Sequence, residues 1–256
     1  GIALGLVTRQ AGDFKRGLKL VEEALRIAEA HFGPEHEVTA HCLVELSSAQ
    51  VAAGDPPAAF ASAQRALSLA EKTPPVDPAL LGEALNAVAV ARFMRGDPVA
   101  AEPLFRRALE LREAALGREH HLVARAAENL GMALRATGER EEGERMLQRA
   151  LAIYERVAPS HPDTPHCLNS LALNARSRGD FAEARRLWER ALEIGERVLG
   201  EEHPTVAGVL NNLANLRKNM GDYAAAQALL ERCLAIRERV RGPDHPEVAQ
   251  ALTNLA

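Results

Sequence analysis

Apolar residues recur at helical spacing in two successive stripes, seen most clearly over residues 204–242. The first stripe consists of Val206, Val209, Leu210, Leu213 and Leu216, and the second of Tyr223, Ala226, Leu230, Cys233, Leu234 and Ile236. Intervals of three and four place each set on one face of a helix. Pro204 stands where the first helix would begin, Gly221 where it would end, and Asp222 where the second would be capped. The segment therefore predicts an antiparallel pair, helix A followed by helix B.

This two-helix pattern repeats along the whole chain. Turns of sequence Gly-Asp or Gly-Glu begin at Gly12, Gly54, Gly96, Gly138, Gly179 and Gly221, at spacings of 42, 42, 42, 41 and 42 residues. Small residues recur one turn into helix B, where they let two helix axes approach to about 8–10 Å. They are Gly17, Ala59, Ala101, Gly143, Ala184 and Ala226, and a bulkier slot four residues later holds Val21, Ala63, Phe105, Leu147, Trp188 and Leu230. One pair cannot bury both stripes, so the pairs must stack on their neighbours, and the prediction is an all-α solenoid.

The repeated residues resemble a known family. The run Gly-Asp-Phe/Tyr…Ala…Arg-Ala-Leu-x-Ile is similar to the tetratricopeptide repeat, and the segments Leu199–Ala207 and Leu210–Ala214 are similar to its longer, kinesin-light-chain type. The resemblance implies a right-handed superhelical solenoid of antiparallel helix pairs, with helix A on the concave face. We expect one solenoid domain over residues 1–256, with about six 42-residue repeats truncated at both ends, as an excerpt of a longer protein. Pro56 and Pro98 depart from the pattern, since they replace the aromatic residue of the turn.

Composition narrows the class of protein further. The net charge of −4 at pH 7 disfavours general binding to nucleic acid or membrane surfaces, which requires a concentrated basic face. No apolar run reaches the ~20 residues of a membrane-spanning helix, and we expect a cytoplasmic protein. The cysteines Cys42, Cys167 and Cys233 lack CxxC spacing and fall in slots of small apolar residues, so we expect buried reduced thiols.

Two patterns that could suggest chemistry have simpler explanations. One slot before helix A holds a histidine in most repeats, whereas the third repeat has Pro78 there; the histidines are His36, His120, His161, His203 and His245. Successive helix layers stand about 10 Å apart, whereas zinc ligands lie about 2 Å from the ion, so these residues cannot share a metal. We expect them instead to bond carbonyl groups at the preceding helix C-terminus. No P-loop, HExxH motif or nucleophile elbow occurs, and we predict no catalytic residue, no cofactor and no metal.

Polar residues on helix A form the candidate binding site. If helix A lines the concave face, as the resemblance implies, the residues in its non-packing slots meet a bound partner. They are Glu45, Glu83, Arg125, Asn129, His166, Ser170, Arg176, Asn212, Asn215, Lys218 and Asn219. An Asn amide supplies both a donor and an acceptor and can hold a peptide backbone. The alternative is a set of exposed polar positions without a ligand.

These observations favour a scaffold that binds an extended peptide or partner segment in the groove formed by helix A of each repeat. Glu45 and Glu83 lie toward the N-terminal half, and Arg125, Arg176 and Lys218 toward the C-terminal half. A ligand with acidic residues toward the C-terminal half would complement this arrangement. The resemblance also allows a regulatory or self-association arm of a larger bacterial signalling enzyme, such as a kinase, a caspase-like protease or a signalling ATPase. Such an arm would contact flanking domains or a second copy of the chain.

Overall fold

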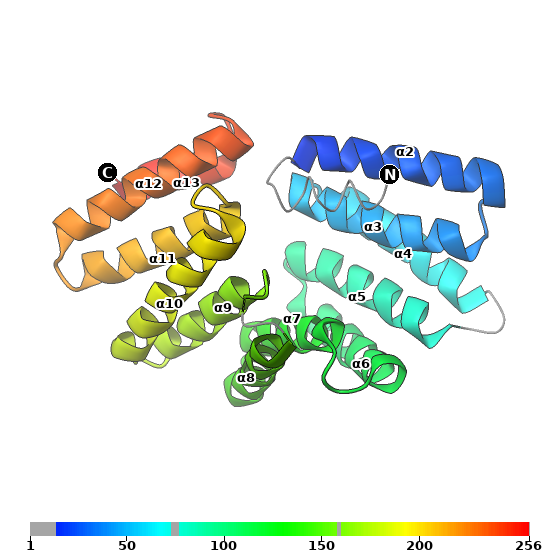
Figure 1. Ribbon diagram of the computed structural model, residues 1–256, viewed down its shortest axis with the longest axis horizontal. Helices are drawn as coiled ribbons and strands as arrows, with labels where there is room; N and C mark the ends of the chain where they lie inside the picture. Colours follow the sequence, from blue (N-terminus) through cyan, green and yellow to red (C-terminus); the bar gives the residue numbers. More distant parts are fainter. Residues whose placement is uncertain (1–13, 73–76, 158–159, 256) are drawn as a thin grey trace. The chain divides into compact units, whose positions relative to one another are not determined.

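The computed structural model describes residues 14–72, 77–157 and 160–255, and within these ranges every regular element is a helix. Figure 1 shows them in order. The helices are α2 (Phe14–Phe32), α3 (Glu37–Ala53), α4 (Pro56–Lys72), α5 (Pro78–Met94), α6 (Pro98–Leu116), α7 (His121–Thr137), α8 (Arg140–Val157), α9 (Thr164–Ser177), α10 (Phe181–Leu199), α11 (Pro204–Asn219), α12 (Tyr223–Arg241) and α13 (Pro246–Leu255). Odd-numbered helices are A helices and even-numbered helices are B helices. The predicted all-α fold is confirmed, while the predicted turn at Gly12 lies outside the described residues.

Contacts divide the chain into two compact units, Gly1–Ile153 and Tyr154–Ala256, called unit 1 and unit 2 below. In unit 1 each helix from α2 to α7 packs against the next one in sequence, and the A helices α3, α5 and α7 also contact one another in order. In unit 2 the same holds from α9 to α13, with the A helices α9 and α11 in contact. Each unit is therefore a stack of helix hairpins. A single domain over residues 1–256 remains a prediction.

The turns between helix A and helix B have the predicted chemistry. Gly221 has a φ of 80°, in the left-handed region that glycine adopts without steric cost. Asp222 then caps α12, because its Oδ1 accepts a hydrogen bond from the backbone N–H of Ala225 at 3.3 Å. Equivalent aspartate caps occur at Asp55, Asp97 and Asp180. Since these bonds involve residues three apart, the turn is determined locally.

The recurring histidines cap helices, but at the opposite end from the one predicted. His203 Nδ1 accepts a hydrogen bond from the backbone N–H of Thr205 at 3.1 Å, at the start of α11. The same bond to the residue two positions later is made by His36, His120, His161 and His245 at 3.2 Å. These Nδ1 bonds are made to residues that follow the histidine, whereas we expected bonds to carbonyl groups at the preceding helix C-terminus. An unprotonated Nδ1 is an acceptor, and the first N–H groups of a helix lack intrahelical partners. In the third repeat Asp77 makes the equivalent bond to Ala79.

Small residues bring helix A and helix B together, and the predicted ones Ala59, Ala101 and Ala184 are each 0% exposed. A second set of small residues on helix B is buried as well. Ala66, Ala108, Ala150, Ala191 and Cys233 are each 0% exposed. The approach is tightest in the fourth repeat, where a Cβ added to Gly143 would lie 2.8 Å from the carbonyl oxygen of Gly131. The bulkier slot is buried in every repeat, from Val21 to Leu230.

The turn aromatics contribute little to this core. Phe181 is 49% exposed and Tyr223 is 67% exposed. Pro56 and Pro98 occupy the same slot as the first residues of α4 and α6. Because the aromatic side chains at this slot face largely outward, their replacement by proline removes little buried area.

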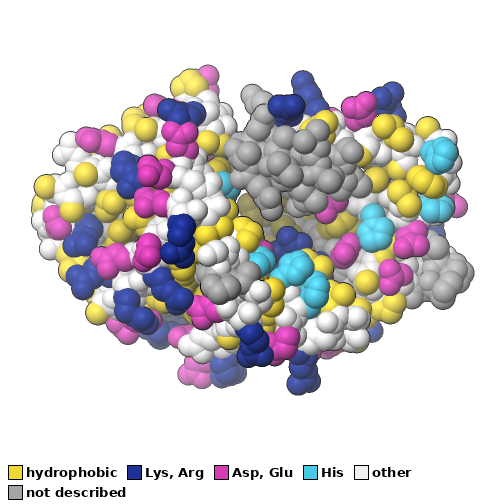
Figure 2. Space-filling model, in the orientation of Figure 1, with side chains coloured by type: hydrophobic (Ala, Val, Ile, Leu, Met, Phe, Trp, Pro, Cys, Tyr) yellow, Lys and Arg dark blue, Asp and Glu magenta, His cyan; other side chains and the backbone are white. Residues whose placement is uncertain are grey.

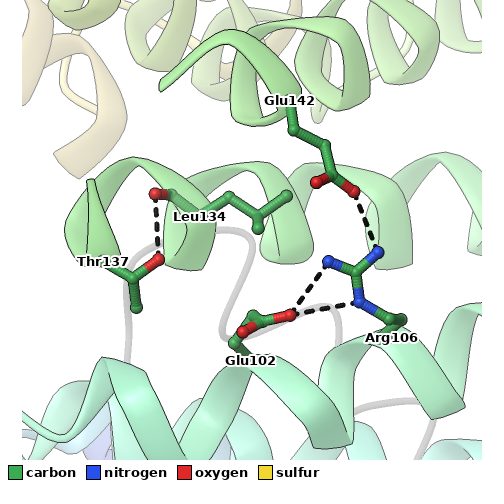
Figure 3. Close-up of polar contacts among 5 residues, drawn as sticks. All are labelled: Glu102, Arg106, Leu134, Thr137 and Glu142. Carbon is green, nitrogen blue, oxygen red and sulfur yellow. Dashed lines mark hydrogen bonds and ion pairs between the residues drawn. The ribbon is translucent and has the colours of Figure 1, made fainter. Parts of the chain in front are cut away.

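Charged residues on the B helices link successive repeats. Arg106 on α6 donates hydrogen bonds to Glu102 one turn earlier and to Glu142 on α8 of the next repeat, as Figure 3 shows. Hydrogen bonding to Glu142, and to a smaller extent to Glu102, raises the pKa of Arg106. Arg232 on α12 likewise pairs with Glu196 on α10 at 2.7 Å. Figure 2 shows positive and negative side chains intermingled on the face in view. Ion pairs on the B helices therefore link successive repeats as well as residues within one helix.

Candidate functional site

A cavity of about 330 Å³ opens among the A helices of unit 1. Its lining includes Glu45 on α3, Glu83 on α5, and Arg125 and Asn129 on α7. These are the four residues of the predicted site that belong to unit 1, and they come from three consecutive repeats. The structure therefore brings together side chains that are up to 84 residues apart in sequence, from Glu45 to Asn129. Arg125 thus lines the same cavity as the two glutamates.

The rest of the lining comes from residues that were not predicted. Apolar side chains contribute through Val44, Val51, Ala87, Val90 and Leu122, and polar ones through Ser47, Ser48, Asn86 and Arg112. Ser48 is exposed, whereas Ser47 is buried. Arg112 comes from helix B and is 4% exposed, with its Nη1 donating to the carbonyl oxygen of Leu122 at 3.2 Å. The cavity therefore combines apolar walls with polar groups at fixed positions, as ligand-binding pockets commonly do.

Of the charged residues around the cavity, Glu83 has an ion-pair partner, whereas Arg125 has none among the described residues. Glu83 Oε2 lies 3.2 Å from Nδ1 of His41 on α3. The hydrogen bond that His41 donates to Glu83 is the largest of the effects that raise the pKa of His41, with the nearby charges of Glu37 and Asp77 adding to it against the effect of burial. Arg125 is exposed and makes no hydrogen bond or ion pair with another described residue. Its guanidinium is therefore available to a ligand without displacing an existing partner.

Asparagine side chains link A helices of neighbouring repeats. Asn129 Nδ2 donates to Oδ1 of Asn86 at 2.9 Å in unit 1. In unit 2 Asn212 donates to Asn169 at 2.8 Å, and Asn254 donates to Asn211 at 2.9 Å. The acceptor in each case stands 43 residues before the donor. Asn129 and Asn212, which were predicted to contact a ligand, thus also form hydrogen bonds between repeats. This role was not predicted, although the spacing of 43 residues is visible in the sequence.

The remaining predicted site residues lie on two A helices of unit 2. His166, Ser170 and Arg176 lie on α9, and Asn212, Asn215, Lys218 and Asn219 lie on α11. His166, Lys218 and Asn219 are exposed. Ser170 is only 3% exposed and offers a ligand almost no surface.

Two of these unit 2 side chains are held by neighbours. The guanidinium of Arg176 lies over the ring of Trp188, 5.8 Å from its centre. Trp188 Nε1 in turn donates to Oδ1 of Asn169 at 2.9 Å, the same oxygen that accepts from Asn212. Asn169 therefore connects the indole and Asn212, so the orientation of the Asn212 amide depends on the core of its neighbouring repeat.

Groups that could perform chemistry are few in the described part of the chain. Cys42, Cys167 and Cys233 are buried, as predicted, and burial is the main cause of the raised pKa of the Cys42 and Cys233 thiols. Within residues 14–72, 77–157 and 160–255, His, Cys, Asp and Glu side chains nowhere gather in threes in a way that could hold a metal ion. Over the same residues no helix combines the length and the apolar character needed to cross a membrane.

Comparison with solved structures shows that the chain has the fold of a helical-repeat protein. BtubC (BKLC) from P. vanneervenii is 24% identical, with a TM-score of 0.65 and coverage of 93% of each chain. A kinesin light chain protein of P. anserina with nearly identical TPR-like repeats is 23% identical, with a TM-score of 0.59 and coverage of 80% of this chain and 98% of that one. The apo form of RapI is 14% identical, with a TM-score of 0.62 and coverage of 94% and 97%. At these identities the likeness concerns the fold.

The sequence itself identifies the family. The profile of the tetratricopeptide repeat family matches residues 2–72, 80–156, 123–194, 163–218 and 205–256. The chain belongs to the tetratricopeptide repeat family, as the sequence pattern predicted. Its members are generally protein–protein interaction scaffolds. A search of curated proteins found no match.

Proposed function

We propose that this chain is a docking module that binds an extended segment of a partner protein across α3, α5 and α7. The observation that carries this proposal is the cavity of about 330 Å³ between these three A helices. Three consecutive repeats contribute to it, so a ligand lying across the helices would contact each repeat in turn. A polypeptide in extended conformation has the required reach, since it advances about 3.3–3.6 Å per residue.

The asparagine pair in the cavity supports a peptide as the ligand. The bond between Asn129 Nδ2 and Asn86 Oδ1 leaves Asn129 Oδ1 and Asn86 Nδ2 without partners among the described residues. Together these atoms supply an acceptor and a donor. A peptide backbone carries one N–H and one C=O per residue and can satisfy both.

Polar residues of unit 2 extend the proposal. His166, Asn215, Lys218 and Asn219 lie on the A helices α9 and α11. We propose that Lys218 attracts acidic residues of the partner, although its Nζ already lies 3.5 Å from the carbonyl oxygen of Asn254. Asn212 would contribute less to binding than Asn215, because its amide donates to Asn169.

A blocking substitution tests the site. Ser48 is exposed at the cavity, so Ser48→Trp would fill the cavity entrance without burying a new side chain in the core. Gln64→Trp, at an exposed position on α4 away from the cavity lining, is the matched control. Peptides selected from a randomised library by the parent protein should bind Ser48→Trp at least about tenfold more weakly, a loss of ~1.4 kcal/mol, and should bind Gln64→Trp normally. Equal binding by parent and Ser48→Trp would contradict the proposal.

A further inference from the structure

The charged groups of the unit 1 cavity are separated by helix. Carboxylates lie on α3 and α5, at Glu45 and Glu83, and an exposed guanidinium lies on α7, at Arg125. The buried guanidinium of Arg112 on α6 also lines the cavity and donates to the carbonyl oxygen of Leu122 on α7, so both cations lie next to α7. Glu83 and Arg125 are equivalent positions of adjacent repeats, 42 residues apart. The cavity therefore has an acidic side and a basic side.

These opposite charges do not neutralise each other by direct contact. Arg125 forms no ion pair with any described residue, and the partner of Glu83 is His41, at 3.2 Å. The guanidinium of Arg125 therefore presents its charge to a ligand without an ion-pair partner, whereas Glu83 does so together with His41.

We propose that the cavity selects a peptide segment carrying a cationic and an anionic side chain close together, with the cation against Glu45 and Glu83 and the anion against Arg125. This inference rests on the proposed docking function and names its ligand class. A spacing of 8–10 Å between helices corresponds to about three residues of extended chain, at 3.3–3.6 Å per residue. The two charged residues of the ligand should therefore be separated by one or two others.

The charge pattern also disfavours the simpler ligands. A segment with only acidic residues would place one carboxylate near Arg125 and another near Glu45 and Glu83, where like charges repel. A segment with only basic residues would place a positive charge near the guanidinium of Arg125, where like charges again repel. The acidic ligand expected from the sequence suits the exposed Lys218 of unit 2 better than this cavity.

The test compares peptide pools selected from a randomised peptide library by the full chain and its variants. The parent pool should be enriched in Lys or Arg separated by one or two residues from Asp or Glu. Arg125→Glu should reduce the acidic enrichment about tenfold while the basic enrichment stays, whereas Arg125→Lys should retain both. Glu83→Gln combined with Glu45→Gln should reduce the basic enrichment and leave the acidic one. Circular dichroism checks that each variant is folded.

The outcomes separate this inference from the docking function on which it rests. If Ser48→Trp selects the same peptides as the parent protein, with the same enrichment, the docking function itself is contradicted. If enrichment depends on Ser48 but selects acidic residues alone, or is unchanged in Arg125→Glu, the docking function stands and the paired-charge ligand is refuted. Enrichment of paired charges that Arg125→Glu alters selectively supports the inference.

Discussion

The side chain of Asn174 offers a sharp test of the packing between helices. It lies on α9 and is 3% exposed, and neither Nδ2 nor Oδ1 has a hydrogen-bond partner among the described residues. The equivalent slot of other repeats is apolar and fully buried; it holds Ala49, Ala91, Ala133 and Leu216, each 0% exposed. An amide in this slot loses its hydration without compensation. We therefore expect Asn174 to lower the stability of the fold.

The substitution Asn174→Leu isolates this cost. Leucine and asparagine both branch at Cγ and carry two further heavy atoms, so the replacement changes polarity more than shape. Leaving a buried donor or acceptor unsatisfied costs about 1–3 kcal/mol. Removing that cost should raise the free energy of unfolding by a similar amount. With a urea dependence of about 1–3 kcal/mol per molar, the midpoint should rise by roughly 0.5–1.5 M.

The reverse change in the next repeat provides the control. Leu216→Asn introduces a buried amide at the equivalent slot of α11, and it should lower the urea midpoint. Both variants and the parent can be compared by circular dichroism during urea titration. A lower midpoint for Asn174→Leu would mean that the amide makes a hydrogen bond to water or to a bound group, and the reasoning from an unsatisfied amide would be refuted.

Much of the fold was predictable because it is determined by residues close in sequence. The turn at Gly221 and Asp222 uses one positive φ and one bond across three residues. The same positive φ and aspartate cap recur in the turns that contain Asp55, Asp97 and Asp180, so the turn could be recognised by comparing repeats. The buried small residues were predictable for the same reason, since Ala66 and its equivalents share a fixed position relative to these turns.

The histidine caps were harder to predict, because the same residue can serve two helix ends. His203 follows one helix and precedes another, and its imidazole can donate to a carbonyl or accept from an N–H. Sequence position alone does not decide between them. The backbone around His203 is extended, with φ of −75° and ψ of 141°, and this geometry directs Nδ1 toward the N–H of Thr205. The deciding factor was a backbone conformation that the sequence pattern left open.

The candidate site was predicted in part. Glu45, Glu83, Arg125 and Asn129 line one cavity because their helices stack in register. The bond between Asn129 and Asn86 was missed, since it depends on which residues of adjacent A helices face each other. The burial of Ser170 was missed for a related reason: a slot that is open in one repeat is closed in another by different neighbours.

Two further predictions concern titration and packing. The hydrogen bond with Glu83 raises the folded-state pKa of His41 above its ordinary value of 6.5, so the stabilisation is fully present below pH 6.5 and is lost as the pH rises through the raised pKa. The stability advantage of the parent over His41→Gln should therefore shrink from acidic to alkaline pH in urea titrations, and a constant difference would contradict this. Ala150 is 0% exposed between the helices of a central repeat, so Ala150→Leu should overpack this interface at a cost of about 1–3 kcal/mol. Arg107→Ala is the control, since it removes an exposed pair with Glu110 that is worth only about 0.2–0.5 kcal/mol. Because each repeat is stabilised by its neighbours, Ala150→Leu should lower the urea midpoint clearly more than Arg107→Ala, and equal midpoints would show that Ala150 does not limit the approach of the two helices.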